Sequence, residues 1–180
     1  MREGRFSLPE TEGLSESVQP GLFPDQRKGE TVNMEKLPPI EKIAEAYSAL
    51  ADGRLTISSD GTQARINSSD GTKNYTVCWK DRHYTSNDSA TYWAGYPGYP
   101  VLAVWMKQGI LPYAEDIADQ FRNVNWNALN RKYKRKYDRA LESVIEERGL
   151  NREEILSEMQ KVYDTMKTLD CTTGRGKGKP

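Results

Sequence analysis

The tetrapeptide Ser-Asp-Gly-Thr occurs twice in this chain, at residues 59–62 and 69–72, with alternating apolar and polar residues around both copies. Asp-Gly between alternating stretches is a strong hairpin signal, because glycine adopts a positive φ at little cost. Two such turns in quick succession predict a three-stranded antiparallel meander. The expected strands cover residues 54–59, 62–68 and 73–80.

Alternation within these stretches separates the two faces of the predicted sheet. One face collects the apolar side chains Leu55, Ile57, Ala64, Ile66, Tyr75, Val77 and Trp79. The other face carries Arg65, Thr76 and Cys78. A sheet that is apolar on one side needs helices to cover that side, and three strands alone are only marginally stable. Residues 82–86 are a candidate fourth short strand.

Helical periodicity elsewhere in the chain predicts helices that can cover this apolar face. The predicted helices span residues 39–51, 100–108, 112–121, 126–148 and 151–169. The first helix is expected to cover the apolar face of the sheet, and the helix over 100–108 is apolar nearly all round, which predicts burial. The fold class is therefore α+β, a small antiparallel three-stranded meander packed with about five α-helices.

Apolar residues are unevenly distributed, and this pattern suggests the domain boundaries. Hydrophobic residues make up 36% of the chain, which is low for a fully folded domain. Residues 1–35 mix Gly, Pro, Ser and charges without a sustained period, so we predict a disordered or loosely attached N-terminal tail. Residues 36–169 are predicted to form a single α+β domain, and residues 170–180 a flexible basic tail. Met34 is a candidate alternative start.

Bulk composition excludes several classes of protein. Lys plus Arg and Asp plus Glu each number 26, so global charge does not select a partner. The sequence shows neither a signal peptide nor an apolar run of transmembrane length, which favours a cytoplasmic location and no membrane contact. The two cysteines do not indicate a disulfide framework.

Residues typical of catalysis or metal binding are sparse. His83 is the only histidine, which excludes a two-histidine metal site. Ser86 and Asp88 lie near it in the sequence, but proximity in a loop does not give the geometry of a catalytic triad. We therefore predict no catalytic residue, no metal site and no cofactor, and the balance is against an enzyme.

A cluster of positive charge is the first candidate binding surface. Six basic residues lie within nine positions, opposed only by Asp138, and we call them the basic segment: Arg131, Lys132, Lys134, Arg135, Lys136 and Arg139. On the predicted helix over 126–148 they fall opposite an apolar stripe. Like charges four residues apart on a helix each cost about 0.2–0.5 kcal/mol, which a nucleic-acid backbone or an acidic protein surface would relieve. Internal pairing with the glutamates over 142–158, or a simply solvated face, is the competing explanation.

An aromatic cluster is the second candidate surface. The stretch over 92–100, which we call the aromatic joint, follows the predicted sheet and contains aromatic residues joined by Gly and Pro. With the tyrosine before it, the joint offers a predicted ligand-binding set of Tyr84, Tyr92, Trp93, Tyr96 and Tyr99. Exposed rings beside cations can stack bases or hold a flat ligand. Packing between the sheet and the helices is the competing explanation.

These observations favour a non-enzymatic binding or adaptor module whose basic segment contacts nucleic acid. The alternative from another class is a small-molecule-binding protein or enzyme with an aromatic-lined pocket at residues 84–99. A third alternative is a structural protein that forms homo-oligomers through an exposed sheet edge.

Overall fold

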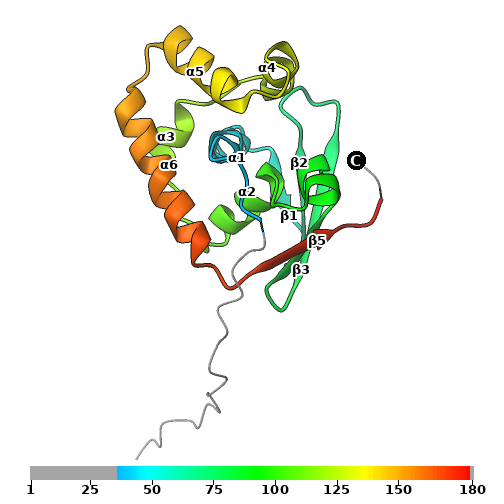
Figure 1. Cartoon of the computed structure of the whole chain (residues 1–180). Coiled ribbons are helices and arrows are strands. Elements are labelled where there is room, and N and C mark those ends of the chain that lie inside the picture. The colour runs from blue at the N-terminus through cyan, green and yellow to red at the C-terminus, as the bar shows by residue number, and fades with distance from the viewer. Residues whose placement is uncertain (1–35, 179–180) are drawn as a thin grey trace, which may run out of the picture.

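A five-stranded mixed sheet forms one side of the molecule in the computed structural model, which describes residues 36–178 (Figure 1). The antiparallel strands follow one another in chain order as β1 (Leu55–Ile57), β2 (Gln63–Asn67), β3 (Asn74–Lys80) and β4 (His83–Ser86). The last strand, β5 (Thr172–Arg175), pairs with β4 in parallel. The predicted tail over 1–35, including Met34, lies outside the described residues.

The two predicted hairpins are present, and the register confirms the predicted faces. Ile66 of β2 lies opposite Leu55 of β1 and opposite Tyr75 of β3. Apolar side chains of all three strands therefore share one face. The candidate fourth short strand is present as β4. With β5 the sheet has five strands rather than the three expected.

Strand β5 falls within the segment that the sequence predicts as a flexible basic tail, and this prediction missed it. The hydrogen bonding between the two segments extends one residue beyond β5, since Gly176 N–H donates to Ser86 O at 2.8 Å. A Cβ atom built on Gly176 would lie 2.7 Å from the Ser86 carbonyl carbon. Glycine at this position permits the close approach of the two backbones.

The helices surround α1 (Lys42–Ala51), which lies at the centre of the molecule in Figure 1. The others are η1 (Ala90–Ala94, a π-helix), α2 (Tyr99–Lys107), α3 (Glu115–Asp119), α4 (Trp126–Lys132), α5 (Tyr137–Arg148) and α6 (Arg152–Lys167). Helix α1 packs chiefly against α2 and α3, and it also contacts α6, whereas α2 lies against β3 and β4. The layers therefore run from the sheet to α2 to α1, which corrects the expectation that α1 covers the sheet. Residues Pro100–Met106 of α2 are all buried, so this helix can be packed on both sides.

The prediction of one helix over 126–148 is wrong, because the chain forms two helices there, α4 and α5. Lys134 and Arg135 between α4 and α5 both have positive φ, at 51° and 63°. Arg135 N–H donates to Asn130 O at 2.8 Å, and Lys134 N–H donates to Arg131 O at 3.2 Å. This bonding pattern is a Schellman motif, with lysine at the position that glycine usually takes. Because the helix ends at this motif, like-charged residues four positions apart no longer lie one helical turn from each other.

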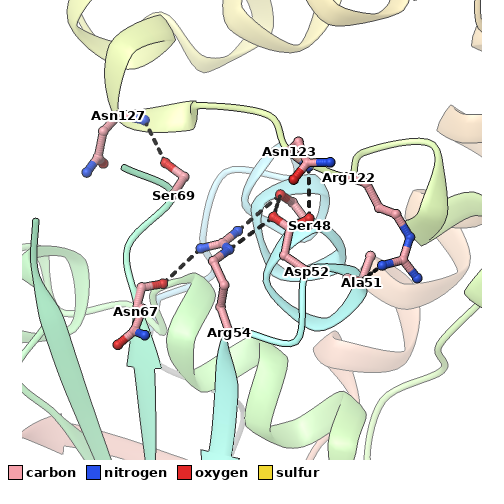
Figure 2. A network of polar contacts seen from close by, with 9 residues as sticks. All are labelled: Ser48, Ala51, Asp52, Arg54, Asn67, Ser69, Arg122, Asn123 and Asn127. Carbon is pink, nitrogen blue, oxygen red and sulfur yellow. Dashed lines mark hydrogen bonds and ion pairs between the residues drawn. The ribbon is translucent and has the colours of Figure 1, made fainter. Parts of the chain in front are cut away.

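Polar contacts at the end of α1 fix the chain that leads into α4 (Figure 2). The Arg54 guanidinium donates to Asp52 Oδ2 at 3.1 Å and to the Asn67 carbonyl at 2.9 Å, which joins α1 to the end of β2. Asn123 N–H donates to the other oxygen of Asp52 at 2.8 Å. Asn127 N–H, in the first turn of α4, donates to Ser69 Oγ at 3.1 Å. Helix α4 is thus held next to the β2–β3 turn.

Candidate functional site

A cleft of about 610 Å³ lies between α1, the β2–β3 turn, the aromatic joint and the junction of α4 with α5. This volume is in the usual range for small-molecule sites, about 300–1,000 Å³. Its basic lining residues are Lys42, Lys73, Arg131, Lys134 and Arg135. Its acidic lining residues are Glu45, Asp70 and Asp88, and its aromatic ones are Tyr75, Tyr96, Tyr99 and Tyr137. The cleft therefore combines parts of both surfaces that the sequence suggested separately.

The break between α4 and α5 divides the basic segment. Arg131, Lys134 and Arg135 line the cleft, and we call them the cleft cations. Lys132, Lys136 and Arg139 are exposed and do not line it, and we call them the outer cations. Within residues 36–178, no ion pair involves any of these six side chains. The internal pairing considered from the sequence is not formed there, since Glu142 pairs with Arg152 and Glu158 with Lys161.

The predicted aromatic set is also divided by the fold. Tyr96 and Tyr99 line the cleft. Tyr84 is buried, donates to Gln108 Oε1 at 2.8 Å and packs edge-on against Trp105, so it is a core residue rather than a ligand contact. The rings of Tyr92 and Trp93 lie under the Arg175 guanidinium of β5, at 5.4 and 5.9 Å from their centroids. Neither of them lines the cleft.

A buried ion pair of α1 forms one wall of the cleft. Lys42 Nζ lies 2.8 Å from Glu45 Oε1, and both side chains are almost fully buried. Burial alone would lower the pKa of Lys42, but the charge and hydrogen bond of Glu45, with smaller contributions from Tyr137 and Tyr96, raise the pKa above its ordinary value. Lys42 therefore stays protonated at neutral pH.

The same ion pair clamps the α4–α5 junction onto α1. Asn130 Nδ2 of α4 donates to Glu45 Oε1 at 3.0 Å. Lys42 Nζ lies 3.8 Å from the centroid of the Tyr137 ring in α5, within cation–π distance. Neither Lys42 nor Glu45 is among the site residues predicted from the sequence, where the only available signal is their i,i+3 spacing within a mostly apolar helix. Their contacts support the positive-φ backbone that presents the cleft cations.

Asp88 holds the start of η1 and is the other functional candidate that the sequence did not select. Its Oδ1 atom accepts the N–H groups of Ala90 at 3.0 Å and Thr91 at 3.1 Å. A Cβ atom built on Gly98 would lie 2.0 Å from this oxygen, so only glycine leaves room for the carboxylate. The available signal was an aspartate two residues before a short helical segment, which is typical of a cap.

The Ser-His-Asp arrangement considered from the sequence is not assembled. His83 Nδ1 lies 2.8 Å from Thr172 Oγ1, whereas Asp88 is engaged with η1. Ser86 Oγ accepts the backbone N–H of Asp88 at 3.2 Å. Residues 36–178 contain no group of three or more His, Cys, Asp or Glu side chains placed to hold a metal ion.

Three buried polar atoms in the residues that line the cleft have no hydrogen-bond partner within the described part of the chain. They are Asp88 Oδ2, Asn130 Oδ1 and Tyr99 OH. An unsatisfied buried polar group costs about 1–3 kcal/mol. Burial raises the pKa of Tyr99, so its hydroxyl keeps its proton and can donate as well as accept. These three atoms are shielded from solvent by the residues around them, so they are polar groups buried beside the cleft rather than groups presented to it.

The comparisons with known proteins give a family but no activity. The family described as "Uncharacterised conserved protein UCP014422" matches residues 35–172. That range includes every residue that lines the cleft. No curated protein and no solved structure matches the chain. Among the helices that the structure describes, none has the length and apolar character needed to cross a membrane.

Proposed function

We propose that this chain, which belongs to the UCP014422 family, is a binding module that holds a phosphate-bearing molecule in the cleft. The observation that carries the proposal is the position of the cleft cations. Arg131, Lys134 and Arg135 have no ion-pair partner within residues 36–178, and they line a cleft of ligand size.

Electrostatics favours an anion at this place. The three cleft cations belong to one short turn, so their charges repel one another at close range. Phosphate oxygens accept charge-assisted hydrogen bonds, and the guanidinium group binds them with two parallel N–H donors. A phosphate group on this turn would relieve the repulsion and use donors that the fold leaves free.

The backbone of the junction supports the same interpretation. Non-glycine residues with positive φ are uncommon, and two in succession carry a conformational cost of about 1–2 kcal/mol each. The contacts of Lys42 and Glu45 with the neighbouring helices keep this conformation in place. Strain of this kind is concentrated at ligand-binding sites, where it fixes the positions of side chains.

The test is phosphate binding by variants that remove equal charge at different places. Inorganic pyrophosphate is titrated into the full chain at low salt by calorimetry. Replacement of Arg131, Lys134 and Arg135 by alanine is expected to weaken binding at least tenfold, since each charge-assisted bond contributes about 1.5–3 kcal/mol.

The matched control replaces the outer cations Lys132, Lys136 and Arg139 by alanine, with the same change of net charge. At about 0.15 M salt, where charges farther than about 8 Å from the ligand are largely screened, this variant is expected to bind pyrophosphate within about twofold of the parent. The proposal is overturned if pyrophosphate does not bind at low salt. Equal loss in the two triple variants would also overturn it, because it would indicate diffuse attraction rather than a site.

A further inference from the structure

We infer that the phosphate-bearing ligand is an oligophosphate, a molecule with at least two phosphate groups in a row, and that Lys73 binds the group farthest from Lys134 and Arg135. This inference rests on the proposed function and adds how far the anion extends along the cleft. It depends on a cation of the β2–β3 turn that is not one of the cleft cations.

Lys73 adds a positive charge from a different wall of the cleft. It lines the cleft from the β2–β3 turn, whereas the cleft cations line it from the end of α4 and the residues that follow. Its side chain is exposed, and within the described part of the chain it forms no ion pair. The ammonium group of Lys73 is therefore as available to an anion as the cleft cations are.

The two walls are joined where α4 begins. Asn127 N–H donates to Ser69 Oγ at 3.1 Å, so the first turn of α4 lies against the β2–β3 turn (Figure 2). Arg131 Nε donates to Asn127 O at 3.3 Å, which keeps this guanidinium near the contact. The Arg131 guanidinium therefore lies between the β2–β3 turn and the far end of α4.

The basic groups of the cleft consequently form a row rather than a single point. Helix α4 has seven residues, which corresponds to a length of about 10 Å at a rise of about 1.5 Å per residue. Lys134 and Arg135 follow the last residue of this helix, whereas Lys73 belongs to the turn at its beginning. A single phosphate bound at one end of the row leaves the other end without a counter-charge. A chain of phosphates can contact both ends.

Asp70 opposes binding at the turn, because its carboxylate repels an anion. The Oδ1 atom of Asp70 accepts the hydroxyl groups of Ser68 at 2.7 Å and Thr72 at 2.8 Å, and the Thr72 N–H at 3.1 Å. These bonds hold the carboxylate within its own turn, and no ion pair with Lys73 is formed among the described residues. Removal of the Asp70 charge should therefore strengthen the binding of an oligophosphate.

The test compares the loss of Lys73 with the loss of a lysine elsewhere in the same sheet. Inorganic phosphate and tripolyphosphate are titrated by calorimetry into the full chain and into the variants Lys73→Ala and Lys80→Ala, at about 0.15 M salt. Lys80 is exposed at the end of β3 and does not line the cleft, so its variant loses the same charge outside the site. A longer anion carries more charge and binds any basic site more tightly. The informative quantity is therefore the effect of each variant on each ligand.

Lys73→Ala is expected to weaken tripolyphosphate binding about tenfold and to leave phosphate binding within about twofold of the parent, because only the longer anion loses a charge-assisted hydrogen bond. Lys80→Ala should change neither affinity by more than about twofold. Asp70→Asn should strengthen tripolyphosphate binding severalfold. Thermal melting of each variant verifies that it is folded.

The outcomes separate this inference from the proposed function. If both anions bind through the cleft cations but Lys73→Ala weakens the two equally, the inference is overturned and the proposed function stands. The same holds if Lys73→Ala weakens tripolyphosphate no more than Lys80→Ala does, or if Asp70→Asn weakens it. If neither anion binds even at low salt, both are overturned.

Adenosine 5′-triphosphate distinguishes a free oligophosphate from one that is esterified to a larger molecule, because it carries the same chain of phosphates as tripolyphosphate. Tighter binding of tripolyphosphate would identify the free chain as the ligand, and tighter binding of the nucleotide the esterified chain. Either result supports the inference if Lys73→Ala weakens the tighter ligand, and overturns it if that ligand binds independently of Lys73.

Discussion

The two Ser-Asp-Gly-Thr turns have the same sequence and the same backbone hydrogen bond, but they differ in what lies next to them. The glycines have nearly equal φ, +67° at Gly61 and +70° at Gly71. Each donates its N–H at 2.9 Å to the carbonyl of the serine three residues before it. The side chains of Asp60 and Asp70 each accept the N–H of the following threonine at 3.1 Å. Local sequence therefore determines the backbone conformation of the turn.

Tertiary contacts make only the second turn part of the cleft. Ser69 Oγ accepts the Asn127 N–H of α4, whereas Ser59 is exposed and makes no such contact within the described residues. Asp70 and Thr72 line the cleft together with the cleft cations. A sequence motif can therefore determine a local conformation without indicating a function. What the turn takes part in depends on which distant helix contacts it.

The largest expected effect comes from the ion pair that holds α4 against α1. Helix α4 is also the element that contacts the second Ser-Asp-Gly-Thr turn. Glu45→Gln should lower the free energy of unfolding by about 3 kcal/mol, because Lys42 would remain buried without a counter-charge. Urea unfolding measures this change. Glu41→Gln, in the residue preceding α1, is the control and should change stability by less than about 0.5 kcal/mol. A loss below about 1 kcal/mol for Glu45→Gln would show that the pair does not stabilise the junction.

A second pair of variants tests whether the turns are locally equivalent. Gly61→Ala and Gly71→Ala should each lower the free energy of unfolding by about 1–2 kcal/mol, because alanine is strained at positive φ. No heavy atom lies within 4 Å of a Cβ built at either position, so the strain should be the same. Thermal and urea unfolding of both variants measure it. A clearly larger loss at Gly71 would contradict the equivalence and show that docking adds to the local cost.

The serines test the docking contact itself. Ser69→Ala leaves the Asn127 N–H without its acceptor and should cost about 1 kcal/mol. Ser59→Ala should be within about 0.5 kcal/mol of the parent, because this side chain is exposed. Hydrogen exchange gives a second measurement: the Gly71 amide should exchange more slowly than the Gly61 amide, and Ser69→Ala should remove the difference. Equal exchange rates in the parent would argue that the turn is not held by α4.

The smallest expected effect is a difference in acid sensitivity. Hydrogen bonds from Ser58 and Ser68 first, and then from the following threonines, lower the pKa of Asp60 and of Asp70 below the ordinary value. Their stabilising contribution is therefore complete above the unfolded-state pKa of about 3.9 and is lost as the pH falls through the folded-state pKa.

Asp70→Asn should accordingly flatten the fall of stability with decreasing pH below about 4, as measured by urea midpoints. Asp60→Asn should flatten it less, because the side chain of Asn127 contributes to lowering the pKa of Asp70 and has no counterpart at Asp60. An identical acid dependence in the two variants would mean that the neighbouring helix does not act on Asp70.

The sequence predicted features that depend on residues close together in the chain. The Asp-Gly turns, the shared apolar face of Ile66 and Tyr75, and the burial of the helix over 100–108 all follow from patterns within a few positions. Five residues now seen at the cleft were also selected: Tyr96, Tyr99, Arg131, Lys134 and Arg135. They were assigned to two separate surfaces, because nothing in the pattern indicated that the surfaces converge.

Features that depend on distant contacts could not be predicted. The break at Lys134 and Arg135 lacks the glycine that usually marks it, and it is supported by Glu45, 85 residues from its partner Asn130. The role of Asp88 depends on space left by Gly98, ten residues later in the sequence. Strand β5 needs the edge of β4, which the sequence alone did not place near the end of the chain.

The parallel pairing of β5 with β4 has a consequence for shortened forms of this protein. Without residues after Leu169, the outer edge of β4 would expose its unpaired N–H and C=O groups. The exposed aromatic side chain of Trp93, 60% accessible even with β5 present, would lose its covering arginine at the same time. Strand β5 therefore covers a sheet edge at which chains truncated before it could add strands to one another.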